Sequence, residues 1–168
     1  MPTTAQLTAL KADLAANAAT VAINGMATAI NAVPHGTANA QAVADWYNLP
    51  AAPAFTVWRT DVSKDEVNGA VDWTEVVALA TNPLLAFQLL KDQSKVNASQ
   101  ASIRAAFGAI FPAATKPNSN AGLLAVARRS ATNAEKLFAT GTGTTGSPAT
   151  MGFEGALTAQ DVLNAWSA

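Results

Sequence analysis

The chain of 168 residues contains no cysteine and one histidine, His35. Without thiols it cannot form a disulfide scaffold, a zinc–cysteine site or an iron–sulfur cluster, and it cannot use thiol catalysis. A histidine-based catalytic triad would have to use His35 as its base. This residue stands between Pro34 and Gly36 in a predicted turn, with no serine–aspartate context, so we interpret it as a surface residue.

Charged residues are also scarce. They make up 12% of the chain, with ten basic and eleven acidic side chains and a formal net charge of −1. A nucleic-acid-binding domain normally carries a basic excess, so this balance argues against one. Apolar residues make up 50% of the chain, and a compact domain of this length buries roughly 70% of its unfolded surface. We therefore expect one ordinary domain with a real core.

The N-terminal part of the chain shows no targeting pattern. The first ten residues lack the basic and apolar regions of a secretory signal, so we expect none. Residues 14–44 carry no formal charge apart from His35, but recurrent Asn and Thr, with Gly25 and Pro34, argue against a membrane span. The segment either packs as alanine-rich helices within its own domain or presents an uncharged surface to another chain, and the sequence leaves both open.

Apolar periodicity and capping residues predict a series of helices. We expect an N-terminal helix from Thr3 or Thr4 through Val21, and further helices over 26–33, 38–49, 64–68, 73–79, from Asn82-Pro83, from an N-cap at Asn97 to Pro112, over 123–138 and from Thr158. Residues 55–60 are β-branched and aromatic, which predicts a short extended segment. Residues 84–90 form the most apolar run, so we expect it at the centre of the core.

These elements predict a mainly α fold, a single helical domain with a small β-hairpin or extended arm near the C-terminus. Residues 1–139 form the helical domain, with alanine-rich helices in 3–49 and central helices in 62–139. Residues 140–157 form a Gly/Thr loop and an extended arm. Residues 158–168 form a C-terminal helix.

One glycine pattern matches the residues of a nucleotide-binding fingerprint but not the secondary structure that the fingerprint requires. Gly141-x-Gly143-x-x-Gly146 fits G-x-G-x-x-G, which needs a strand before it and a helix opening from its last glycines. Here a predicted helix precedes the pattern, and Pro148 with an extended segment follows it. We interpret the segment as a flexible loop after a helix that ends at Gly141.

The acidic residues do not form a convincing site either. Asp61-x-Ser63-x-Asp65 resembles the start of a calcium loop, but Glu66 stands where the loop requires glycine. A capped helix start explains these residues better. We interpret the close pairs Asp65-Glu66 and Asp72/Glu75 as solvated helix faces. The residues therefore predict no catalytic group, no metal and no cofactor, and we expect no enzyme.

Two stretches, Pro50–Thr60 and Ala134–Gly155, carry a resemblance. They are similar to a family of small proteins encoded in the late, virion-structural regions of tailed bacteriophages and prophages. The pattern Gln6-Leu7-x-x-Leu10-Lys11 is also similar to the start of that family. The likeness covers roughly a fifth of the chain, and the Ala/Asn-rich residues 18–39 depart from it. The resemblance implies a phage context and a non-enzymatic role, with no catalytic residues to transfer.

The function that this resemblance implies is that of a structural protein of a phage particle. We expect a ring- or collar-forming component at the head–tail junction or tail, and the alternatives are a capsid decoration protein and an assembly helper. Its partners would be other virion proteins and copies of itself, with no nucleic acid, membrane or small-molecule substrate. It would be made in the host cytoplasm and located in the virion.

Contacts with partners are expected from an arm over residues 141–157, which could add a strand to a neighbouring subunit. Its anchors would be Met151 and Phe153, with Leu157 on the same face. Arg128 and Arg129 form the densest basic patch and could meet an acidic surface. Trp166, two residues from the end, must dock on its own domain or on a neighbour.

Overall fold

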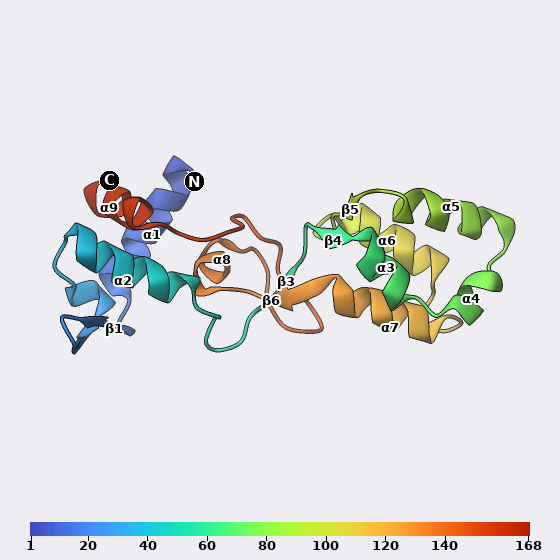
Figure 1. The fold of residues 1–168 in the computed structure, drawn as a ribbon, viewed down its shortest axis with the longest axis horizontal. Coiled ribbons are helices and arrows are strands. Elements are labelled where there is room, and N and C mark those ends of the chain that lie inside the picture. Colours follow the sequence, from blue (N-terminus) through green and yellow to red (C-terminus); the bar gives the residue numbers. More distant parts are fainter. The chain divides into compact units, whose positions relative to one another are not determined.

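The computed structural model describes residues 1–168 and confirms a mainly α fold with a few short strands (Figure 1). None of the helices combines the length and apolar character that crossing a lipid bilayer requires. The chain forms two compact units, the first from residues 1–55 and 130–168 and the second from residues 56–129. The predicted ranges do not follow this division, because both ends of the chain pack together in the first unit.

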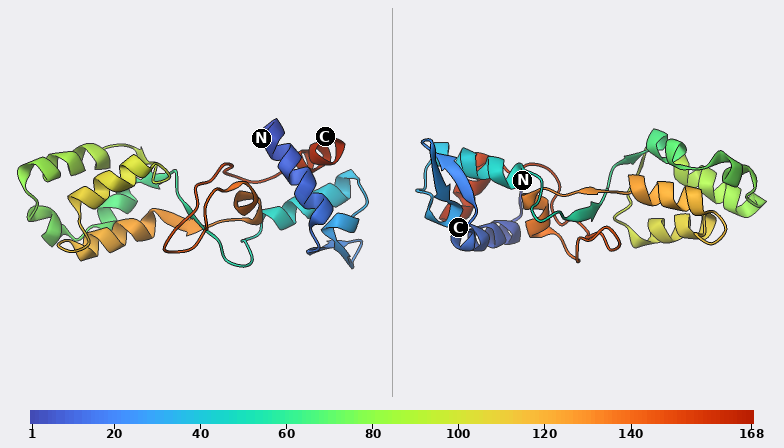
Figure 2. Two further views of the ribbon diagram at one scale, coloured as in Figure 1. Left: turned by 180° about the vertical axis from the view of Figure 1, so that it is seen from behind. Right: turned by 90° about the horizontal axis from the view of Figure 1, so that it is seen from below.

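The first unit is a helical cluster with one hairpin. It contains α1 (Thr4–Ala16), β1 (Thr20–Ile23), β2 (Met26–Ala29), the 3-10 helix η1 (Ile30–Ala32), α2 (Thr37–Asn48), α8 (Asn133–Phe138) and α9 (Ala159–Ser167). The C-terminal helix α9 packs against α1 and α2, and Figures 1 and 2 show the blue α1 beside the red α9. Leu10, Val43, Tyr47 and Val162 are buried where these helices meet.

The prediction of helix through Val21 and over 26–33 is wrong. Helix α1 ends at Ala16, and β1 pairs antiparallel with β2. The turn between the strands has φ of 52° at Asn24 and 80° at Gly25. Asn-Gly favours this two-residue turn because both positions need positive φ, and its twist matches that of the flanking strands. Val21 and Ile23 alternate with exposed residues and reach the core.

The uncharged segment 14–44 supplies the first unit with core residues. Leu14, Val21, Ile30 and Val43 are all buried among the other apolar side chains of this unit. Its exposed positions are occupied mostly by alanine, asparagine and threonine. Apart from Met26, which is exposed, the large apolar side chains of the segment therefore face their own core.

The second unit is a helical bundle with short strand pairs. It contains β3 (Thr56–Trp58), β4 (Val62–Ser63), α3 (Lys64–Ala70), α4 (Trp73–Val77), α5 (Thr81–Lys91), β5 (Lys95–Val96), α6 (Ala101–Ile110), α7 (Pro117–Val126) and most of β6 (Arg128–Ser130). Strand β4 pairs with β5, and β3 with β6. Helix α5 packs on α6, and α3 packs on α7. Phe87 and Phe111 meet edge to face in the core, with ring centroids 5.2 Å apart.

Four helix starts use a reciprocal capping box, in which a Thr or Ser side chain and the third helical residue each bond to the other's backbone. The pairs are Thr3/Gln6 at α1, Ser63/Glu66 at α3, Thr132/Glu135 at α8 and Thr158/Asp161 at α9. The helix starts predicted at Thr3, Ser63 and Thr158 are therefore confirmed. Asp72 caps α4, because its side chain accepts from the backbone N–H of Thr74.

Two other boundaries were predicted wrongly. The helix expected over 123–138 is replaced by α7, β6 and α8, because the chain extends after α7 to pair with β3 and then starts a new capped helix at Thr132. Asn97 does not cap α6. Its side chain accepts from the backbone N–H and hydroxyl of Ser99, which makes a local turn, and Gln100 is the N-cap.

The apolar run 84–90 does form a helix, but it does not lie at the centre of the core. Phe87 is buried, whereas Leu85 and Leu89 are 53% and 76% exposed. Helix α5 lies at the surface of the second unit and packs one side on α6. A helix that is apolar all round can bury only the side that it packs, so its other leucines face outward.

Candidate functional site

The predicted contact arm over 141–157 is a strap that packs on the first unit. Phe153 and Leu157 are only 9% and 2% exposed and belong to the core of that unit. The Gln6 side chain donates to the backbone oxygen of Gly152 at 2.7 Å, and the Leu157 N–H donates to Asn48 Oδ1 at 2.8 Å. Phe153 and Leu157 therefore cannot serve as exposed anchors, which corrects the prediction.

Glycines explain why the strap packs so closely. A Cβ at Gly143 would lie 2.1 Å from the Phe55 ring, and Gly143 has a φ of 66°. A Cβ at Gly152 would lie 2.5 Å from the backbone oxygen of Phe138. Gly146, in contrast, has open space. Within the pattern, Gly143 is therefore needed for close packing, and no helix opens from the pattern as a phosphate-binding loop requires.

The other predicted contact residues already interact within the chain. Arg128 and Arg129 are half-buried on β6, and Met151 is half-buried in the strap. Trp166 docks on its own unit, where its ring stacks on His35 with centroids 4.5 Å apart and planes 11° apart. Trp166 thus takes the first of the two predicted alternatives, and it packs against the same core cluster that contains Phe153.

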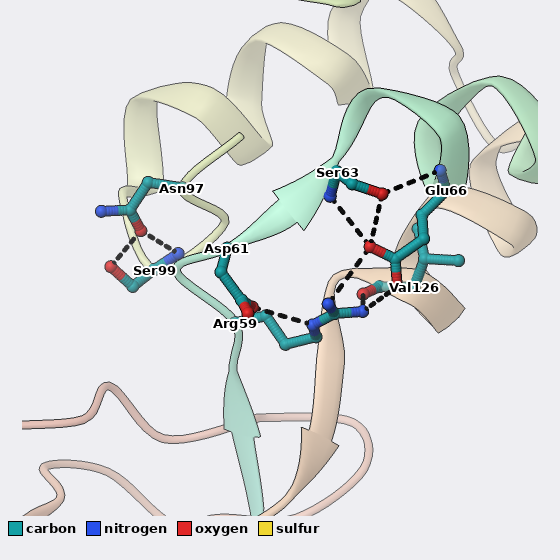
Figure 3. A network of polar contacts seen from close by, with 7 residues as sticks. All are labelled: Arg59, Asp61, Ser63, Glu66, Asn97, Ser99 and Val126. Atoms are coloured by element: carbon teal, nitrogen blue, oxygen red, sulfur yellow. Dashed lines mark hydrogen bonds and ion pairs between the residues drawn. The ribbon is translucent and has the colours of Figure 1, made fainter. Parts of the chain in front are cut away.

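The acidic residues near β4 form an ion-pair network, which Figure 3 shows. Arg59 binds Glu66 through two nitrogens and also contacts Asp61, with Nε 3.2 Å from Oδ1. Hydrogen bonds from Arg59 first, and then from Ser63, lower the pKa of Glu66 to about 2. These carboxylates therefore point at a guanidinium. Nowhere in residues 1–168 are three or more His, Asp or Glu side chains arranged to hold a metal ion.

The second acidic pair binds the start of helix α7. Both oxygens of Glu75 accept backbone N–H bonds, from Asn118 at 3.1 Å and Ser119 at 2.9 Å. Asp72 accepts from the Asn118 amide at 2.9 Å. Burial raises the pKa of Glu75, but hydrogen bonds from Ser119 and Asn118 outweigh it, so the net shift is downward. The carboxylates of Asp72 and Glu75 thus lie at the N-terminus of α7, where the helix dipole favours negative charge. The prediction that they form only a solvated helix face is therefore wrong.

A polar cavity of about 570 Å³ lies in the first unit, lined by Asp13, Asn17, Trp46, Tyr47, Asn133 and Lys136 among others. The Tyr47 hydroxyl donates a short hydrogen bond to the Asp13 carboxylate. Burial first, and then the bond to Asp13, raise the pKa of Tyr47 above its usual value of 10.0. The phenol therefore keeps its proton near neutral pH and acts here as a hydrogen-bond donor.

A smaller apolar cavity of about 70 Å³ lies inside the second unit. Its wall includes Ile103, Phe107 and Leu123, and it is lined also by Gly108 and Leu124. The guanidinium of Arg104 lies 4.4 Å above the Trp58 ring and donates to the backbone oxygens of Ala98 and Ser99, each at 2.7 Å. The positive charge of Arg104 is therefore already bound by groups of the same chain, and the other residues that line the cavity are mostly apolar.

The second unit also exposes large apolar side chains. Trp73 and Val77 are exposed one turn apart on α4. Leu85 and Leu89, which the sequence predicted to lie in the core, are exposed one turn apart on α5. We call Leu85 and Leu89 the α5 ridge. The sequence did indicate that part of α5 would be exposed. Residues 76–90 contain no charged residue, and the run 84–90 has apolar residues on every side of the helix, more than one packed side can bury.

No family model, curated protein or solved structure matches this chain.

Proposed function

We propose that the protein is a structural subunit of a tailed phage particle, which forms a ring or collar at the head–tail junction or tail and acts through protein–protein contacts. The observation that carries this proposal is the meeting of the two stretches with phage-family resemblance. Phe55, in the first stretch, packs against Gly143, in the second, so closely that a Cβ would lie 2.1 Å from its ring. The two stretches therefore share a close packing contact within the first unit.

The surface of the second unit supports the same role. Exposed Leu85 and Leu89 gain free energy when another protein covers them, at roughly 25 cal/mol per Å² of apolar area. The run 76–90 carries no charge that such a contact would have to strip of water. This surface fits a subunit that is covered by neighbours in an assembly.

The test is the copy number of the protein in purified particles of the phage or prophage that encodes it. Quantitative mass spectrometry would count it against the major capsid protein, and an abundant host protein in the same preparation would set the background. We expect a small, ring-sized number. A number equal to that of the capsid protein would favour a decoration protein, and a number at background would leave an assembly helper and overturn the structural role.

A further inference from the structure

We infer that residues 56–129 are a domain inserted into the first unit, and that each unit folds and unfolds on its own. The second unit is one continuous range, whereas the first is made of residues 1–55 and 130–168. The chain therefore begins the first unit, builds the whole of the second and then completes the first. This inference goes beyond the proposed function, because it concerns the chain itself and does not depend on a phage particle.

Each unit has a hydrophobic core of its own. Tyr47 and Val162 belong to the core of the first unit. Phe87 and Phe111 belong to the core of the second, and no buried residue is a member of both cores. Residues 56–129 also exceed the roughly 40 residues below which a chain usually needs a disulfide, a metal or a partner in order to fold. Each core can therefore supply the apolar burial that stabilises its own unit.

The two ends of the insertion lie side by side. In the first unit, the Ala131 N–H donates to the backbone oxygen of Phe55 at 2.8 Å. In the second unit, the Arg59 N–H donates to the backbone oxygen of Ala127, also at 2.8 Å. The chain thus leaves the first unit and returns to it at neighbouring residues, and the two ends of the second unit are neighbours as well. Compact domains whose ends lie close together are the ones that tolerate insertion into another domain.

Hydrogen bonds between distant residues hold each unit together separately. In the first unit, the Asn48 side chain accepts from the Leu157 N–H at 2.8 Å and donates to the Leu157 backbone oxygen at 2.9 Å. This pair joins the two separate parts of the first unit. In the second unit, the buried Ser119 hydroxyl accepts from the Asp72 N–H at 3.0 Å. The second unit can therefore open while the packed ends of the chain stay folded.

One glycine in each unit offers a matched perturbation. A Cβ at Gly122 would lie 1.9 Å from the backbone oxygen of Ala70, and both residues belong to the second unit. A Cβ at Gly152 would lie 2.5 Å from the backbone oxygen of Phe138, and both belong to the first unit. Gly122→Ala and Gly152→Ala therefore place the same methyl group against a backbone oxygen, in one unit each.

Native-state hydrogen exchange of the full-length protein, read by mass spectrometry of its peptides, would measure the stability of each unit. The slowest amides of a cooperative unit exchange only when that whole unit unfolds. We expect Gly122→Ala to speed the slowest amides of residues 56–129 by about 5- to 150-fold, the usual cost of overpacking. The slowest amides of the first unit should keep their wild-type rates. Gly152→Ala should do the reverse.

The controls are Gly108→Ala in the second unit and Gly146→Ala in the first, because a Cβ at either position meets nothing within 4 Å. Neither control should speed exchange in either unit. A variant in which one unit exchanges fully while the other keeps its protection would support the inference most directly. A substitution that speeds the slowest amides of both units, or that prevents the whole chain from folding, would overturn it. The particle count bears on the proposed function alone, so the two proposals fail separately.

Discussion

Arg59 and Glu66 form a two-point ion pair, with Nη1 2.5 Å from Oε1 and Nη2 3.2 Å from Oε2. The same guanidinium donates to the backbone oxygen of Val126 at 3.3 Å, and Glu66 also closes the capping box with Ser63 (Figure 3). The ion pair thus joins the end of β3 and the start of α3, and its guanidinium also holds the end of α7. The pair stabilises the second unit only while Glu66 is ionised.

Acid should therefore weaken the second unit through Glu66. Its pKa is lowered from 4.5 to about 2 in the folded protein, so its contribution is fully present above pH 4.5 and is lost as the pH falls towards 2. We expect Glu66→Gln to be less stable than the wild type at pH 7, with the difference vanishing near pH 2. Urea unfolding across this range measures the difference.

The matched control for this prediction is Asp65→Asn. Asp65 is an exposed neighbour in the same helical turn. Because exposed surface substitutions usually change stability little, its replacement should leave the free energy of unfolding at pH 7 close to that of the wild type. Asp72, Glu75 and Asp92 also have lowered pKa values, but they remain in every variant and cancel in the difference. A constant gap between wild type and Glu66→Gln at all pH values would contradict the role given to Arg59.

Gly122→Ala should destabilise the second unit by about 1–3 kcal/mol. A Cβ at Gly122 would lie 1.9 Å from the backbone oxygen of Ala70, where α7 crosses α3. A backbone oxygen cannot turn away as the end of a flexible side chain can. Gly108→Ala is the control, because it has open space in α6 and should stabilise the helix by about 0.5–1 kcal/mol. Chemical denaturation of both variants should show shifts of opposite sign.

Gly143→Ala should loosen the strap from the first unit. The position has a φ of 66°, which costs a residue with a Cβ about 1–2 kcal/mol, and the new methyl would also collide with the Phe55 ring. We expect a lower melting temperature and faster proteolysis within residues 140–157. Gly146→Ala, in open space, should behave as the wild type. Equal effects of the two substitutions would refute the packing role of Gly143.

Tyr47 should resist ionisation until the first unit unfolds. It is the only tyrosine in the chain, so the ultraviolet absorbance of tyrosinate reports on it alone. Its folded pKa lies above the ordinary value of 10.0, so the stability that its proton supports is present below pH 10 and is lost at higher pH. We expect no tyrosinate signal around pH 10 and then a rise together with unfolding.

Asp13→Asn separates the two causes of this shift. It removes the negative charge that accepts the Tyr47 hydroxyl but leaves the phenol buried. The onset of ionisation should therefore move to lower pH and still stay above 10. An unchanged onset would mean that burial alone holds the proton.

The sequence by itself determined much of the local structure. The helix starts at Thr3, Ser63 and Thr158 followed from side chains that bond to backbone groups three residues away. The extended segment at β3 and the non-helical strap followed equally from local composition. Such features involve neighbours along the chain, so the order of residues contains nearly all of the information that decides them.

Only the tertiary structure decided which apolar residues are buried. Phe153 and Leu157 entered the core of the first unit, whereas Leu85 and Leu89 stayed outside the second. Burial depends on which segments meet, and α9 meets α1 although nearly the whole chain separates them. No pattern within residues 84–90 distinguishes the packed side of α5 from the exposed side. The α5 ridge and the apolar cavity therefore emerged only when the helices were packed.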